Sequence, residues 1–117
     1  MHELGIVMNV AKKVEALAKE NQISEVLSVT LQIGEVSGIM TDYFVDCWNY
    51  FKVRHSFIEN AELIIETIPA LTYCDSCQRT YETVKYGKTC PYCQSPKTWL
   101  IQGNETLIKE ITVPEEA

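Results

Sequence analysis

The sequence is short of positive charge. Of its 117 residues only ten are Lys or Arg, against sixteen Asp or Glu, and the formal net charge is -6. A protein that binds nucleic acid in general needs a basic surface that displaces counterions from the phosphates. The charge balance therefore argues against a nucleic-acid partner.

The chain also lacks a long hydrophobic run. No stretch approaches the roughly 20 apolar residues of a membrane-spanning helix, and the first residues have neither the basic nor the apolar region of a secretory signal. We therefore expect a cytoplasmic protein with no membrane partner, whose thiols stay reduced. The sequence also shows no catalytic pattern, such as paired carboxylates, a nucleophile beside a base, or a phosphate loop in a supporting context. We therefore do not expect an enzyme.

The pattern that remains is one of two helices and several strands. Helical spacing of apolar residues extends from about Glu3 to Asn21, and Thr41 is the expected cap of a second helix from about Asp42 to His55. Alternation from Leu27 to Ile33 predicts a half-buried strand. The runs "AELIIETI" and "ETLIKEITV" predict two more strands, which could pair with each other although the cysteine region separates them in the sequence. The expected buried face of the first helix consists of Val7, Val10, Ala11, Val14, Leu17 and Ala18.

Four of the five cysteines form two C-x-x-C hooks, with twelve residues between the hooks. Paired hooks in a reducing compartment predict a metal site rather than disulfides. Four thiolates complete the tetrahedral shell of Zn(II) and leave no open position, which predicts a structural zinc. The four residues are Cys74, Cys77, Cys90 and Cys93. The fifth, Cys47, is expected to be a buried core thiol.

A redox site is the alternative for the second hook, because "CPYC" is also the active-site sequence of glutaredoxins. That chemistry needs a helix after the first cysteine, and Pro96 interrupts the segment that follows. Zinc is therefore the favoured interpretation. The fold class that we predict is α+β, with two helices packed on a small β-sheet and an inserted zinc-ribbon module. Residues 1–69 and 100–117 would form the α/β domain, and residues 70–99 the zinc ribbon, with short strands around a turn at Gly87.

A histidine directly after the initiator methionine raises the question of a second metal. The amine of Met1, the backbone nitrogen of His2 and its imidazole can form two low-strain chelate rings around one ion. Planar nitrogen ligation suits Ni(II) or Cu(II), and nickel is favoured because reduced copper prefers sulfur. The backbone amide or carboxylate of Glu3 is the nearest fourth donor. The alternative is that His2 is idle, as terminal residues often are.

Several stretches together resemble the HypA/HybF family of hydrogenase-maturation nickel chaperones. These are "MHELGIV", "IGEVSGI", the paired C-x-x-C hooks and "IQGNETLIKEI", and the resemblance covers essentially the whole chain. It implies that His2 binds nickel, together with Glu3, and that the four hook cysteines bind structural zinc. Some members carry histidines next to the zinc cysteines, where this chain has Gln78 and Gln94.

The resemblance also implies a function. Such a protein binds Ni(II) at its N-terminus and, with the GTPase HypB, delivers it to the large subunit of NiFe-hydrogenase, while some members also serve urease. The nickel is cargo, the zinc is structural, and the state in solution is a monomer or a homodimer. A zinc-ribbon adaptor or transcription-associated module with no nickel role is the alternative, and nickel binding by the zinc-loaded protein separates the two.

Overall fold

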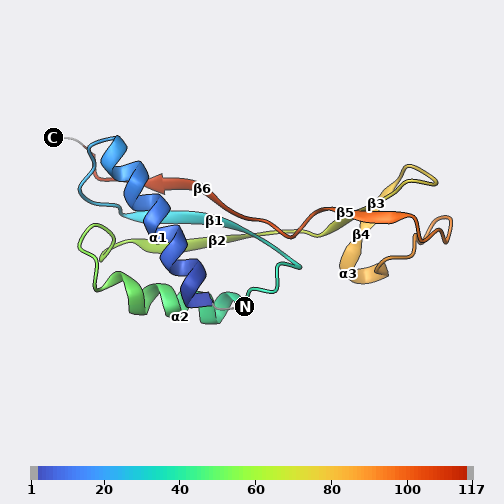
Figure 1. Ribbon diagram of the computed structural model, residues 1–117, viewed down its shortest axis with the longest axis horizontal. Coiled ribbons are helices and arrows are strands. Elements are labelled where there is room, and N and C mark those ends of the chain that lie inside the picture. Colours follow the sequence, from blue (N-terminus) through green and yellow to red (C-terminus); the bar gives the residue numbers. More distant parts are fainter. Residues whose placement is uncertain (1–2, 116–117) are drawn as a thin grey trace. The chain divides into compact units, whose positions relative to one another are not determined.

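A computed structural model describes residues 3–115, so the predictions for Met1 and His2 lie outside the described residues. The predicted α+β class is confirmed. The elements are α1 (Glu3–Glu20), β1 (Ser28–Gly34), α2 (Thr41–Lys52), β2 (Glu62–Ile68), β3 (Leu71–Cys74), β4 (Thr80–Glu82), α3 (Thr83–Tyr86), β5 (Thr98–Gln102) and β6 (Thr106–Thr112) (Figure 1). Among the described residues, none of the helices has both the length and the apolar character to cross a membrane.

The chain divides into two compact units. Of the described residues, the first unit contains 3–31, 39–66 and 107–115, and the second contains 32–38 and 67–106. The division predicted from the sequence, with 1–69 and 100–117 in one domain and 70–99 in the other, concerns independent folding and stays a prediction.

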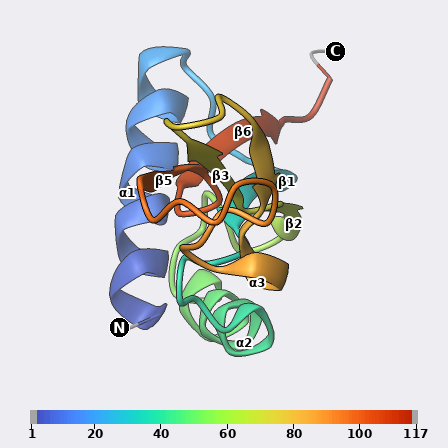
Figure 2. The ribbon, with the colours of Figure 1, turned by 90° about the vertical axis from the view of Figure 1, so that its right-hand side faces the viewer.

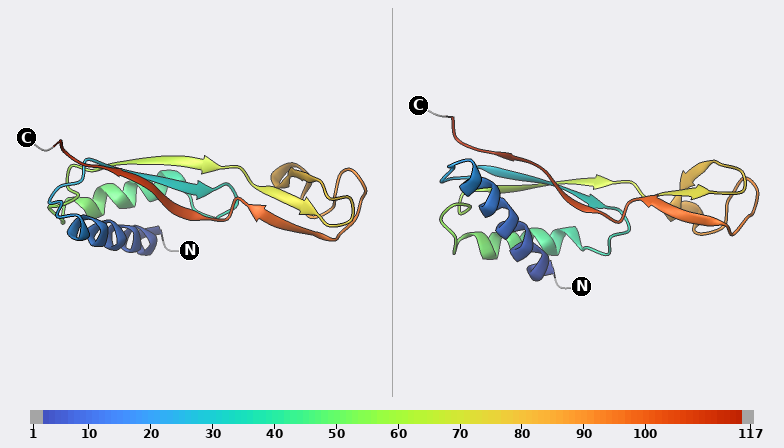
Figure 3. Two further views of the ribbon diagram at one scale, coloured as in Figure 1. Left: turned by 90° about the horizontal axis from the view of Figure 1, so that it is seen from above. Right: turned by 45° about the horizontal axis from the view of Figure 1, so that its top comes forward.

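One sheet has the strand order β2-β1-β6, and α1 and α2 both lie on the same face of it (Figure 3). The expectation that β2 and β6 pair directly is wrong, because β1 lies between them. Its central place follows from its burial, since Val29, Leu31 and Ile33 are at most 2% exposed and Thr30 is only 4% exposed. A central strand has a partner on each side, so neither of its edges is left open to solvent.

The two helices supply the core against this sheet. Five of the six residues expected on the buried face of α1 are buried, but Leu17 is 40% exposed. Helix α2 buries Phe44, Cys47 and Trp48, and the indole N–H of Trp48 donates to the carbonyl of Ala61 at 2.9 Å. This bond lets the largest side chain of the core be fully buried without an unpaired polar atom.

The second sheet has the order β4-β3-β5, and both pairs are antiparallel. Of the short strands predicted around a turn at Gly87, β4 is present before the turn, but residues Thr83–Tyr86 form the short helix α3 (Figure 2). Gly87 has φ +70° and its N–H donates to the carbonyl of Thr83, which ends this turn. Strand β5 lies outside the strands that the sequence pattern predicts, since its sequence, "TWLIQ", does not alternate.

Three backbone segments of the second unit cross at Gly34, Ala70 and Gly103. A Cβ at Gly34 would overlap the backbone of Gly103, and a Cβ at Gly103 would overlap Ala70. Two carboxylates fix the crossing: Glu35 accepts from the N–H of Ala70 at 2.8 Å, and Glu105 from the N–H of Gly103 at 2.7 Å. Gly34, the first glycine of "IGEVSGI", and Gly103 of "IQGNE" are therefore required by close backbone approach.

We expect Gly103→Ala to lower the free energy of unfolding by about 3 kcal/mol, combining steric overlap with a strained positive φ. Gly87→Ala is the matched control, because Gly87 also has positive φ but has no atom within 4 Å of the place that an added Cβ would occupy. The control should lose less, because it carries the cost of its positive φ without the steric overlap. Urea unfolding of the zinc-loaded proteins measures both, and equal losses would contradict the close approach at Gly103.

Candidate metal centre

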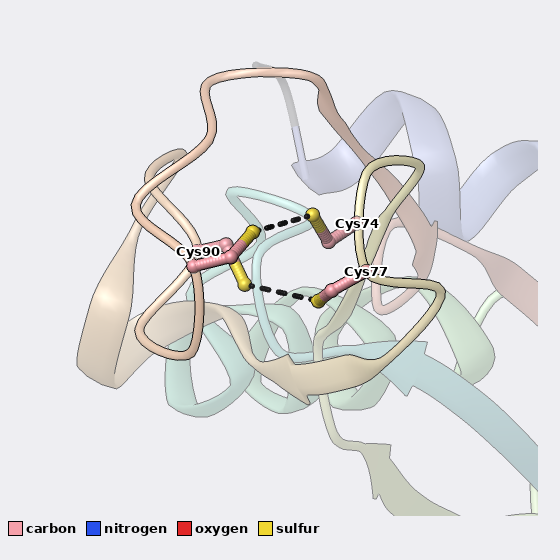
Figure 4. A group of neighbouring side chains, drawn as sticks. Cys74, Cys77 and Cys90 are labelled. Carbon is pink, nitrogen blue, oxygen red and sulfur yellow. Dashed lines mark hydrogen bonds between the residues drawn. The ribbon is translucent and has the colours of Figure 1, made fainter.

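The four predicted zinc cysteines come together in the second unit, and their sulfurs all lie within 4.8 Å of one another. The Sγ atoms of Cys74 and Cys93 are 3.6 Å apart, and so are those of Cys77 and Cys90. Figure 4 shows the side chains of Cys74, Cys77 and Cys90 pointing toward one another from the two hooks. Each pair therefore joins one cysteine of the first hook to one of the second.

Both hooks have the same backbone conformation. The residue after each second cysteine has positive φ, 60° at Gln78 and 58° at Gln94, and its N–H donates to the carbonyl of the first cysteine at 2.8 Å. Non-glycine residues hold this conformation at a cost of about 1–3 kcal/mol when the surrounding structure requires it. Here the N–H of the left-handed residue closes the turn that contains both cysteines of a hook.

Without a cation the four thiols cannot all ionise. Burial acts to raise the pKa of Cys90, but the N–H groups of Cys93 and Tyr92 outweigh it and lower that pKa to about 7. The N–H of Ser95 acts to lower the pKa of Cys93, but burial and the neighbouring thiols raise it to about 12. A divalent cation is what allows the remaining thiols to lose their protons near neutral pH.

The geometry fits Zn(II). A regular tetrahedron with Zn–S bonds of about 2.3 Å has sulfurs about 3.8 Å apart, close to the two distances of 3.6 Å in this cluster. Four sulfur ligands close the shell, which is typical of a structural site. Cys47 is buried in the first unit, 7% exposed, and is not part of the cluster.

We expect Cys74→Ser to lose stoichiometric zinc and Cys47→Ala to keep it, because only Cys74 belongs to the tetrahedral shell. Loss of one thiolate should also unfold much of the second unit, since zinc supplies on the order of 10 kcal/mol to folding in sites of this kind. Metal content by mass spectrometry and near-UV circular dichroism report the two effects. The reverse pattern of zinc contents would contradict the assignment.

Glu3 has a role that the sequence did not reveal. Its side chain is 6% exposed, and Oε2 accepts a hydrogen bond from the backbone N–H of Met40 at 3.1 Å. Met40 is the N-cap of α2 and has no side-chain cap of its own, so the expectation that Thr41 caps this helix is wrong. A carboxylate at this position satisfies an N–H and interacts favourably with the helix dipole. Glu3 therefore ties the first turn of α1 to the start of α2.

We expect Glu3→Ala to lower the free energy of unfolding by about 1 kcal/mol, as for loss of a helix cap. Glu3→Gln is the matched control, because its amide oxygen still accepts from Met40, and it should lose less. Urea unfolding of zinc-loaded protein without nickel measures this, and an unchanged stability for Glu3→Ala would exclude the capping role.

A second contact lies near the start of α2. The thiol of Cys47 is hydrogen-bonded to the hydroxyl of Tyr43, four residues earlier, and this bond is the main cause of the raised pKa of Tyr43. The Cys47 thiol thus has a local partner within α2. This fits the expectation of a core thiol rather than a metal ligand.

A family model described as "Hydrogenase/urease nickel incorporation, metallochaperone, hypA" matches residues 1–113. The chain belongs to this HypA family. The match includes the Met-His-Glu start, both cysteine hooks and the glycines of the backbone crossing. The chain is therefore a nickel metallochaperone of hydrogenase maturation with a four-cysteine zinc site, which is a delivery function and not a catalytic one.

Curated relatives and solved structures agree with the HypA family. The hydrogenase maturation factor HypA of Campylobacter jejuni is 35% identical over 105 residues, covering 90% of this chain and 92% of that protein. HypA of Geobacter metallireducens is 34% identical, with 97% and 99% covered. The solution structure of the Ni metallochaperone HypA from Helicobacter pylori is 26% identical and superposes with a TM-score of 0.74, covering 99% of this chain and 100% of that one.

Proposed function

We propose that the protein holds Ni(II) at Met1 and His2, keeps zinc at Cys74, Cys77, Cys90 and Cys93, and passes the nickel to the large subunit of a NiFe-hydrogenase. The single observation that carries this proposal is the match of the HypA family over residues 1–113, which includes the Met-His-Glu start. The GTPase HypB is the proposed partner in delivery, and the cytoplasm the proposed location, both on the strength of the family.

The chemistry of the two proposed donor sets keeps the metals apart. An amine, a backbone nitrogen and an imidazole lie in one plane, which suits Ni(II), whereas four thiolates in a tetrahedron suit Zn(II). A nickel site with few protein ligands at the chain terminus can release its ion by ligand exchange. The closed sulfur shell has no free position for such an exchange.

For Glu3 we propose that the backbone nitrogen, rather than the side chain, completes the nickel site. The side-chain Oε2 already accepts from the N–H of Met40, and the side chain is buried. Glu3 is also the first residue of α1, and the first N–H groups of a helix have no intrahelical acceptor. Nickel could therefore bind the backbone nitrogen of Glu3 without breaking a hydrogen bond within α1.

We expect one Ni(II) to bind per zinc-loaded, untagged chain, and binding to weaken at least about tenfold in His2→Ala or when residues are added before Met1. Each change removes one nitrogen of the chelate, and chelate ligands act together. Isothermal titration measures this, with His55→Ala as the control for the other histidine. Full affinity in the extended protein would exclude the terminal amine as a ligand.

We expect acidification to release nickel before zinc. An α-amine has a reference pKa of about 7.7–8.0 and an imidazole about 6.5, so protons compete with nickel as the pH falls from roughly 7 to 5.5. The sign follows from the ligands alone, because each must lose its proton to bind. Metal content after dialysis at stepped pH tests it, and zinc lost first, or nickel retained at about pH 5, would contradict the amine–imidazole site.

Delivery itself is tested with purified partners. Zinc- and nickel-loaded protein is mixed with HypB, GTP and a nickel-free hydrogenase large subunit, in the presence of a chelator that captures free nickel. The proposal expects nickel in the large subunit with the wild-type chain and none with His2→Ala. Equal transfer by both would show that the N-terminal site is not the source of the nickel.

A further inference from the structure

The second unit has a hollow with aromatic walls next to the zinc cluster. Its volume is about 310 Å³, and its lining includes Tyr81, Tyr86 and Tyr92 from β4, α3 and the second cysteine hook. Tyr81 is 4% exposed, and its hydroxyl donates to the carbonyl of Gly87 at 2.8 Å. Tyr86 and Tyr92 are 43% and 55% exposed. Tyr81 is therefore held in place at the base of the hollow, while the rings of Tyr86 and Tyr92 are accessible to solvent.

Each exposed ring is paired with a cation. The guanidinium of Arg79 lies 4.9 Å from the ring centre of Tyr92, and the ammonium of Lys85 lies 5.3 Å from that of Tyr86. Among the described residues, neither cation has a carboxylate within ion-pair distance, since the ion pairs there join Lys19 to Glu15 and Lys109 to Glu66. Two cations without a carboxylate partner thus flank a hollow whose lining combines aromatic rings with polar groups, in a chain whose net charge is -6.

The fold holds these groups in place. The backbone carbonyl of Arg79 accepts from the N–H of Cys74 at 2.9 Å, so its backbone is part of the first hook. Tyr92 lies within the second hook, between Cys90 and Cys93. The arrangement of cation and ring at Tyr92 is therefore a product of the same two turns that gather the four sulfurs.

We propose that this hollow is a docking site for an acidic peptide segment of a partner protein. One apolar side chain of the segment packs between Tyr86 and Tyr92, and flanking carboxylates bind Arg79 and Lys85. Charge complementarity favours carboxylates over other groups, because the one acid in the lining, Glu82, would repel a doubly charged phosphate more strongly. Strand β4 is also an edge of its sheet, next to which an extended peptide can lie.

The test uses zinc-loaded, full-length, ¹⁵N-labelled protein and a blocked peptide, acetyl-Glu-Glu-Leu-Phe-Glu-Glu-amide. NMR titration should shift the amides of Lys85, Tyr86 and Tyr92, and higher salt should weaken binding. The double variant R79Q/K85Q should bind at least about fivefold more weakly, because two ion pairs are lost. K13Q/K97Q is the matched control, since it removes the same charge outside the hollow, and its affinity should change less than about twofold.

Other outcomes overturn the proposal. Equal binding of a peptide in which Gln replaces every Glu would show that the charges are not recognised. Chemical-shift changes confined to other residues would place the binding site elsewhere. Tighter binding of guanosine monophosphate than of the peptide at the same amides would point to a nucleotide site. Shifts of these amides on dilution of the protein alone would identify a second copy of the chain as the occupant.

Discussion

The mutual repulsion of four closely spaced thiolates is the constraint on which the second unit depends. Its small buried cluster consists of Cys74, Tyr81 and Cys90, with Cys77 packed against them, so the ligands are themselves most of the core. A core of this size cannot hold a fold without an added staple. The cation that neutralises the sulfurs therefore also fixes the turns at Gln78 and Gln94 and everything that these turns position.

The first unit is stabilised differently from the second, because two helices packed on a sheet form a conventional apolar core that needs no metal. Trp48 and Phe44 are fully buried there, and burial of each large apolar side chain contributes about 1.5–3 kcal/mol. The start of α1 is tied to α2 through Glu3 and Met40. The core of this unit and the start of α2 therefore form without any contribution from the sulfur cluster.

The sequence was most informative where local pattern decides structure. Helical spacing located α1 and α2 within a few residues, and the spacing of the two hooks was enough to identify the sulfur cluster. It was least informative where distant residues meet. The close approach of Gly103 to Ala70 and the bond from the N–H of Met40 to Glu3 join segments more than 30 residues apart, and no periodicity in the sequence signals them. Leu17 fits the helical period and is nevertheless 40% exposed.

X-ray absorption at both metal edges of one sample tests the central claim most directly. Untagged protein carrying one zinc and one nickel should show zinc with four sulfur neighbours at about 2.3 Å. The nickel edge should show only nitrogen and oxygen neighbours in a planar arrangement. Sulfur around nickel, or nitrogen in the zinc shell, would contradict the separation of a transferable nitrogen site from a closed sulfur site.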